Sequence, residues 1–157
     1  LMIRRPPRST HCISSAASDV YKRQVHCCEW NPVAVKALEW SLYRNNIANR
    51  CTIHEGDNRL TAPNLSGQAD RVILGLLPTA EGGFELAINC LKKIGGCLHI
   101  HGIAPANDHD SWVDETIIKL SNLNHDFSIA ETSRVRVKSY APHWDHIVLD
   151  VNLSPRA

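Results

Sequence analysis

The sequence lacks the features that mark membrane-spanning and disulfide-rich secreted proteins. No stretch approaches the roughly 20 consecutive apolar residues that a membrane-spanning helix needs. The 6 cysteines form no Cys-x-x-Cys pair and no disulfide-rich spacing, so we expect buried free thiols in a reducing compartment. The formal net charge is only +1, so contact with nucleic acid would need a local basic patch. These absences predict a soluble, cytoplasmic protein of 157 residues, the size of one domain.

The first 24 residues lack both helical and strand periodicity, and they combine Arg and Pro doublets with Ser-rich filler. A basic, Ser-rich and almost acid-free composition fits a transit peptide. The string more closely resembles a translated sequencing adaptor. We therefore expect residues 1–24 to be a non-native or disordered segment and the folded domain to occupy residues 25–155.

From Val25 onward, apolar strand-like runs alternate with helical patterns, which is typical of an α/β domain. The expected helices occupy residues 32–46, 81–94 and 111–123. The expected strands lie within residues 25–30, 50–55, 69–78, 96–103, 133–140 and 146–153. The run 69–78 is almost wholly apolar, which is typical of a central parallel strand covered on both faces. The short linker between the last two strands predicts an antiparallel turn.

The residues that follow the first three strands are the candidate ligand-binding residues, because open α/β sheets bind ligands beyond the carboxyl ends of their strands. A carboxylate after the first strand can accept two hydrogen bonds from a ribose diol. The Gly-Asp-Asn turn after the second can contact an adenine ring. The candidates are Glu29, Trp30 and Asn31, then Gly56, Asp57 and Asn58, then Leu76, Leu77 and Pro78.

Each of these signals has a purely structural alternative. Glu29 precedes Asn31-Pro32, so it can be an acid that the helix dipole favours near a helix start. Gly56-Asp57-Asn58 is a good turn sequence in its own right. The functional interpretation therefore depends on the order of the signals along the chain.

Basic residues give candidates for RNA contact. Arg134, Arg136 and Lys138 alternate along a predicted strand and are expected to share one face. Such a row can contact phosphates, although it can also be a solvated edge that discourages aggregation. Arg59, beside the expected ligand pocket, is a comparable candidate.

Histidines at alternate strand positions raise the possibility of a metal site. His99 and His101 share a strand face, and His143 and His146 lie near the next turn. No third ligand has an obvious spacing, and a central strand can hold hydrogen-bonded histidines. We therefore predict no metal.

Several runs together carry a family resemblance. They are CEWNPVAVKALEWSLYRNN, RCTIHEGDNR, ADRVILGLLPTAEGGF, GGCLHIHG and VKSYAPHWDHIVLDV, which cover essentially all of residues 25–155. Their most specific parts are Leu-Gly-Leu-Leu-Pro and Ser-Tyr-Ala-Pro-His. The chain resembles the tRNA wybutosine-synthesizing protein 2 family, a branch of the Rossmann-like class I S-adenosylmethionine-dependent enzymes related to the tRNA guanine methyltransferases.

This resemblance implies S-adenosyl-L-methionine as cofactor and transfer of its 3-amino-3-carboxypropyl group to 4-demethylwyosine in tRNA(Phe), during wybutosine biosynthesis. It implies neither a DNA nor a membrane partner, and it leaves the catalytic residues unassigned. The apolar Leu76-Leu77-Pro78 end is poorly suited to receive an amine nucleophile, so amine methylation is disfavoured. The alternatives are a tRNA guanine methyltransferase, a non-catalytic RNA- or nucleotide-binding module and a dinucleotide-dependent oxidoreductase, since an acid after the second strand of the complete fold serves both cofactors.

The sequence after Val25 lacks the strand and Gly-rich turn with which a class I domain begins. In the family order, 3-2-1-4-5-7-6, that strand is central. We therefore expect a truncated sheet with two unpaired strand edges that folds poorly. We also expect the 157-residue chain to bind the cofactor weakly and to be inactive, so that the function belongs to a longer parent enzyme.

Overall fold

A computed structural model describes residues 24–156 of the chain. The segment expected to be non-native, 1–24, lies outside the described residues apart from Gln24. The helical elements are α1 (Pro32–Arg44), η1 (Ala48–Arg50), α2 (Asn58–Thr61), η2 (Ala62–Leu65), η3 (Glu81–Gly83), α3 (Phe84–Cys90) and α4 (His109–Leu123). The strands are β1 (Val25–Glu29), β2 (Cys51–Glu55), β3 (Arg71–Leu74), β4 (Gly96–Pro105), β5 (Phe127–Ala141) and β6 (Trp144–Pro155).

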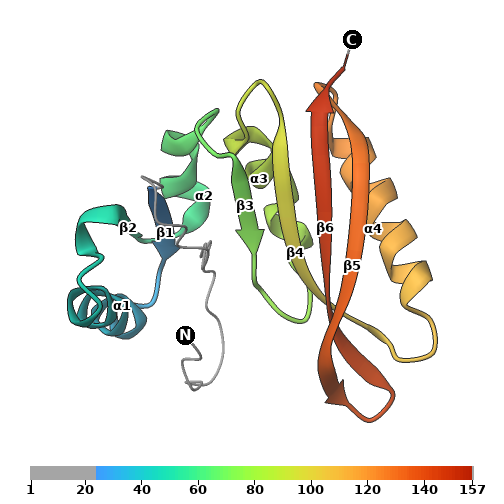
Figure 1. Ribbon diagram of the computed structural model, residues 1–157, viewed down its shortest axis with the longest axis horizontal. Coiled ribbons are helices and arrows are strands. Elements are labelled where there is room, and N and C mark those ends of the chain that lie inside the picture. Colours follow the sequence, from blue (N-terminus) through green and yellow to red (C-terminus); the bar gives the residue numbers. More distant parts are fainter. Residues whose placement is uncertain (1–23, 157) are drawn as a thin grey trace.

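The strands form two separate sheets. β1 pairs in parallel with β2, and a 4-stranded sheet has the order β3-β4-β6-β5. β3 and β4 are parallel, whereas β6 is antiparallel to both β4 and β5. β1 and β3 point the same way and lie on the facing sides of the two sheets (Figure 1). Within residues 24–156 no strand pairs between them, which matches the expected position of the central strand.

Within the described residues, β3 lies at an unpaired sheet edge, as expected for a sheet that lacks its central strand. Among the described residues, β3 pairs with β4 only and forms the edge of its sheet. Its buried side chains, Val72 and Leu74, alternate with the exposed Arg71 and the half-buried Ile73. In the described part of the chain, β3 therefore buries its apolar side chains mainly on one face.

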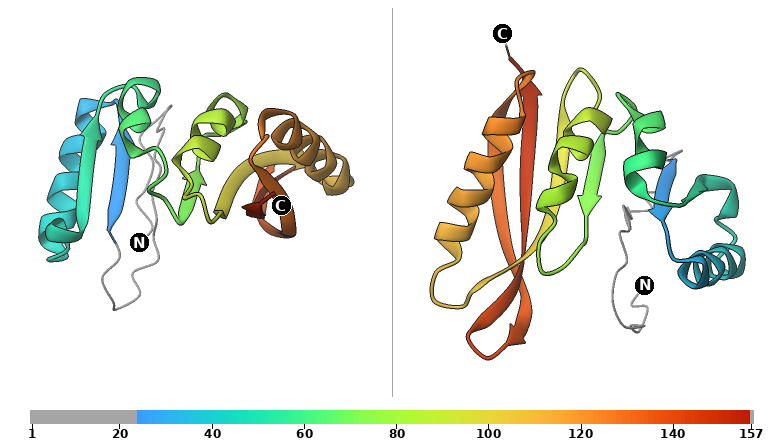
Figure 2. Two further views of the ribbon diagram at one scale, coloured as in Figure 1. Left: turned by 90° about the horizontal axis from the view of Figure 1, so that it is seen from above. Right: turned by 180° about the vertical axis from the view of Figure 1, so that it is seen from behind.

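The main core lies between the 4-stranded sheet and the helices α3 and α4, which cover one of its faces (Figure 2). Phe84 of α3 and Leu120 of α4 pack in one cluster with Leu98, Ile100 and Leu149 of the sheet. These five side chains are each at most 2% exposed. Since burial of large apolar side chains is the main stabilising term, this layer holds the fold together.

The helix expected over residues 81–94 is shorter in the structure. It begins with the 3₁₀ turn η3 and ends at Cys90. Leu91 then adopts an extended conformation and forms an isolated parallel bridge with Ala69, and the Lys92 N–H donates to the Ala69 carbonyl at 2.9 Å. Pairing with the segment before β3 therefore replaces the last helical turn. The inward face was predicted correctly, because Phe84, Ala87, Ile88 and Leu91 are all buried.

Helix α1 forms where its sequence predicts. Asn31 caps it, because its Oδ1 accepts from the Val33 N–H at 2.9 Å, and Pro32 occupies the first turn. Val35 and Leu42 are the buried side chains of this helix, which packs against β1 and β2. The helix therefore starts directly beyond the carboxyl end of β1.

Candidate functional site

Glu29 is the buried carboxylate at the carboxyl end of β1. Its residue is 3% exposed, and its Oε1 accepts a hydrogen bond from the Asn31 N–H at 2.9 Å. Among residues 24–156, the only hydrogen bond to this carboxylate is the one from Asn31. The bond to Asn31 also satisfies one N–H at the start of α1, so the structural alternative for Glu29 is confirmed and its ligand-binding role stays a prediction. Trp30 is 49% exposed beside it.

The Gly56-Asp57-Asn58 turn lies against the same strand end. The Gly56 N–H donates to the Glu29 backbone carbonyl at 2.9 Å, which joins the end of β2 to the end of β1. Gly56 has a φ of +127°, a conformation that residues with a Cβ rarely adopt. The sequence therefore needs glycine here to turn the chain at this edge.

Asp57 caps α2 and binds Arg59. One carboxylate oxygen of Asp57, Oδ1, accepts from the Arg59 N–H at 2.9 Å, and the guanidinium of Arg59 engages both carboxylate oxygens. Asn58 is the half-buried first residue of that short helix. A nucleoside reaching Asp57 would have to compete with an exposed ion pair, which is weak in water. Arg59, a candidate for RNA contact, is held by this carboxylate rather than extended away from it.

Leu76, Leu77 and Pro78 follow β3 on the other side of the gap between the sheets. The two leucines are half-buried and Pro78 is exposed. Because β1 and β3 run in the same direction, all three candidate segments lie at the carboxyl ends of parallel strands (Figure 1). The structure thus joins Glu29 directly to Gly56 and places the apolar run at the corresponding end of the neighbouring sheet.

The expectation that the three basic residues of β5 share one face is wrong. Arg134 and Arg136 pair with Leu149 and Ile147 of β6, but a register shift after Arg136 pairs Lys138 with His146. A β-bulge inserts one extra residue, so the alternation changes face at that point. Lys138 therefore lies on the opposite face from the two arginines.

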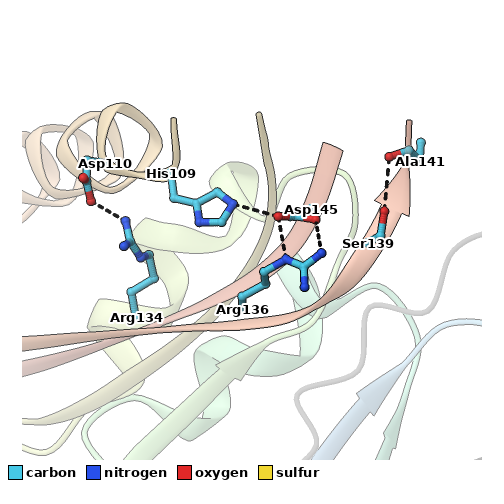
Figure 3. Close-up of polar contacts among 7 residues, drawn as sticks. All are labelled: His109, Asp110, Arg134, Arg136, Ser139, Ala141 and Asp145. Atoms are coloured by element: carbon cyan, nitrogen blue, oxygen red, sulfur yellow. Dashed lines mark hydrogen bonds and ion pairs between the residues drawn. The ribbon is translucent and has the colours of Figure 1, made fainter. Parts of the chain in front are cut away.

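Both arginines of β5 are bound by acids on the α4 side of the sheet (Figure 3). Arg134 pairs with Asp110 of α4. Arg136 forms a two-pronged bond to Asp145, with Nε to Oδ2 at 2.6 Å and a terminal nitrogen to Oδ1 at 2.8 Å. These contacts reduce the charge that the arginines offer to phosphates.

Asp145 is the centre of a polar network that the sequence did not reveal. Its side chain is 5% exposed, and it also contacts His109 Nε2 at 3.0 Å. The hydrogen bonds from Arg136, followed by that from His109, lower the pKa of the Asp145 carboxyl. The three members come from α4, β5 and β6, and no local motif links positions 109, 136 and 145.

The strand histidines hydrogen-bond to protein groups. His99 Nδ1 lies 2.6 Å from Asp150, and His101 Nδ1 lies 2.9 Å from His146 Nε2. Burial, followed by the charges of His99 and His146, lowers the pKa of His101 to about 4. No group of three or more His, Cys, Asp or Glu side chains within residues 24–156 is arranged to hold a metal ion. His143 is an exposed turn residue with a φ of +66°.

The order of the strands, with an acid at the end of β1 and a Gly-Asp-Asn turn after β2, is that of a Rossmann-like α/β fold, the fold of class I S-adenosylmethionine-dependent enzymes. The family described as the TRM5/TYW2 methyltransferase domain matches residues 12–137. The chain belongs to this family.

Curated relatives carry consistent names. A tRNA wybutosine-synthesizing protein 2/3/4 of Oryza sativa is 44% identical over 131 residues, covering 81% of this chain and 12% of the relative. A tRNA wybutosine-synthesizing protein 2 homolog of Danio rerio is 37% identical over 166 residues, covering 83% and 40%. The chain therefore spans less than half the length of either relative.

The fold is shared with a solved structure of M. jannaschii TYW2 in complex with AdoMet. The TM-score is 0.75 at 22% identity, and the match covers 85% of this chain and 59% of that chain.

None of the helices that the described residues form is long and apolar enough to cross a membrane.

Proposed function

We propose that residues 24–156 supply the adenosine-binding strand ends of a cytoplasmic S-adenosyl-L-methionine-dependent tRNA transferase. The proposed reaction is transfer of the 3-amino-3-carboxypropyl group to 4-demethylwyosine in tRNA(Phe). The observation that supports it most directly is the bond between the Gly56 N–H and the Glu29 carbonyl, which brings the predicted ribose acid and the predicted adenine turn together. The names of the curated relatives support the choice of reaction.

The residues present fit the adenosine part of the cofactor. Among residues 24–156, the Glu29 carboxylate accepts one hydrogen bond, and an ionised carboxylate can accept more than one, as a ribose diol requires. Trp30, half-exposed next to it, offers an aromatic surface. Asp57 can accept from an exocyclic amine once Arg59 moves aside, and Asn58 can donate to a ring nitrogen.

The bound cofactor would supply a sulfonium-activated carbon, and the chain's task is to orient that carbon toward the base. Orientation decides which carbon of the sulfonium reacts, so positioning rather than a new catalytic group distinguishes this transfer from methylation. The segment Leu76-Leu77-Pro78 supports this reaction because its side chains are apolar and offer no acceptor to an amine nucleophile. Thr79, next in sequence, is exposed and provides a hydroxyl near that end.

The main rival is a tRNA guanine methyltransferase, since the matching family description contains both branches. A test uses a chimaera in which residues 25–155 replace the matching segment of the Danio rerio relative. The chimaera is incubated with tRNA(Phe) carrying 4-demethylwyosine and with cofactor labelled either in the carboxyl or in the methyl carbon. We expect the carboxyl label to reach the RNA and the methyl label to stay in solution.

Transfer of the methyl label would instead support the guanine methyltransferase. Binding of tRNA with transfer of neither label would support a non-catalytic module. The unaltered Danio rerio relative serves as the positive control, because it carries the same upstream part.

A further inference from the structure

An exposed aromatic and basic surface runs along α1. Val33, Trp40 and Tyr43 are 72%, 64% and 76% exposed. At 3.6 residues per turn they lie within about 80° of one another on the helix, opposite the buried Val35 and Leu42. We call Val33, Lys36, Trp40, Tyr43 and Arg44 the α1 stripe.

The α1 stripe carries two basic residues, and one exposed acid, Glu39, lies at its border. Lys36 and Arg44 are exposed and lie on the same side as the two aromatic rings, and Arg50 in η1 follows closely. The guanidinium of Arg44 sits 5.4 Å from the centre of the Trp40 ring, which places a cation over an exposed aromatic face. Aromatic faces interleaved with cations suit single-stranded RNA, because bases stack on the rings while the cations meet phosphates.

The α1 stripe also begins beside the candidate cofactor site. Val33 lies four residues after Glu29, and the rise of 1.5 Å per residue puts Trp40 about 10 Å further along the helix. α1 lies beside the β1–β2 sheet, on the side of the molecule away from β5 and β6 (Figures 1 and 2). RNA bound along α1 would therefore approach the carboxyl end of β1 from the side opposite to the β5 arginines.

We propose that the α1 stripe binds unpaired nucleotides of the RNA substrate, with bases stacked on Trp40 and Tyr43 and phosphates contacted by Lys36 and Arg44. This proposal rests on the proposed function insofar as the substrate is RNA. It assigns a contact surface that the basic row of β5 does not include. It also explains why two large aromatic side chains are exposed on a helix whose other side is packed.

The test compares two double variants of the full 157-residue chain. Trp40→Phe with Tyr43→Phe keeps both aromatic faces, whereas Trp40→Leu with Tyr43→Leu keeps apolar character without a ring. Fluorescence anisotropy measures binding of a labelled single-stranded RNA of about 12 nucleotides and of the same sequence as a duplex. Circular dichroism melting of both variants verifies that these exposed substitutions leave the fold intact.

We expect the leucine variant to bind the single strand at least about 10-fold more weakly, because each lost base stack weakens binding substantially. The phenylalanine variant should bind within about 3-fold of the original chain, since a phenyl ring still stacks. Duplex binding should be equal for all three chains. Trp144→Leu, at an aromatic residue 46% exposed on β6, is the matched control and should leave binding unchanged.

Equal binding of the single strand by the leucine variant and the original chain would overturn the proposal and favour a protein partner for the α1 stripe. An equal loss in Trp144→Leu would also overturn it, because any exposed tryptophan would then serve. Failure of the proposed function has a different signature. The label-transfer assay would then fail in the chimaera although the ring-dependent binding of single-stranded RNA persists.

Discussion

Replacing Glu29 separates its structural bond from its proposed ligand bonds. Glu29→Gln keeps an amide oxygen that can accept from the Asn31 N–H, now at 2.9 Å, but it removes the negative charge and turns one acceptor into a donor. Bonds to a charged group contribute about 1.5–3 kcal/mol each, roughly twice the neutral value. Losing the charge from two ribose contacts should therefore cost about 1.5–3 kcal/mol, or about 10- to 150-fold in affinity.

Isothermal titration calorimetry of the chimaera with S-adenosylhomocysteine measures this loss. Thermal unfolding should show the free energy of unfolding lowered by about 1.5–3 kcal/mol in Glu29→Ala, which loses the half-buried bond from the Asn31 N–H, and by about half as much in Glu29→Gln, which keeps that bond with a neutral acceptor. Glu55→Gln is the matched control, since Glu55 is the exposed partner of Glu29 in the β1–β2 register. Unchanged affinity in Glu29→Gln, or an equal loss in Glu55→Gln, would refute the reasoning.

Three further predictions concern stability. Phe84→Ala, at a core residue 2% exposed, should lower the free energy of unfolding in urea by about 3–5 kcal/mol, while Ile94→Ala, 78% exposed, should change it by less than about 0.5 kcal/mol. Gly102→Ala would place a Cβ 2.1 Å from Trp112 Cζ2 and should cost about 1–3 kcal/mol, and adding Trp112→Leu should recover most of that loss. The lowered pKa of His101, about 4, means that the unfolded chain binds more protons than the native one between that value and the ordinary pKa near 6.5, so stability should fall as the pH drops through this window. NMR titration of His101 checks this, and a titration midpoint near 6.5 would contradict it.

Local patterns predicted the strand ends well. Asn31-Pro32 correctly indicated the start of α1, and the acid before it was correctly expected at the end of β1. Gly56 was expected in a turn, and its positive φ gives the physical reason. These features depend on neighbouring residues in the sequence, so they can be recognised without a structure.

Features that depend on distant pairing were missed or misjudged. The end of α3 depends on the bridge between Leu91 and Ala69, which are 22 positions apart in the sequence. The face of Lys138 depends on a bulge whose register is set by β6. Alternation along one strand carries no information about such an insertion, so the sequence predicted one face where the structure has two.

The most direct test of the central claim is a crystal structure of the chimaera bound to S-adenosylhomocysteine. We expect both ribose hydroxyls to hydrogen-bond to the Glu29 carboxylate and the adenine ring to lie beside Asp57 and Asn58. An adenosine bound elsewhere, with Glu29 contacting only the Asn31 N–H, would contradict it.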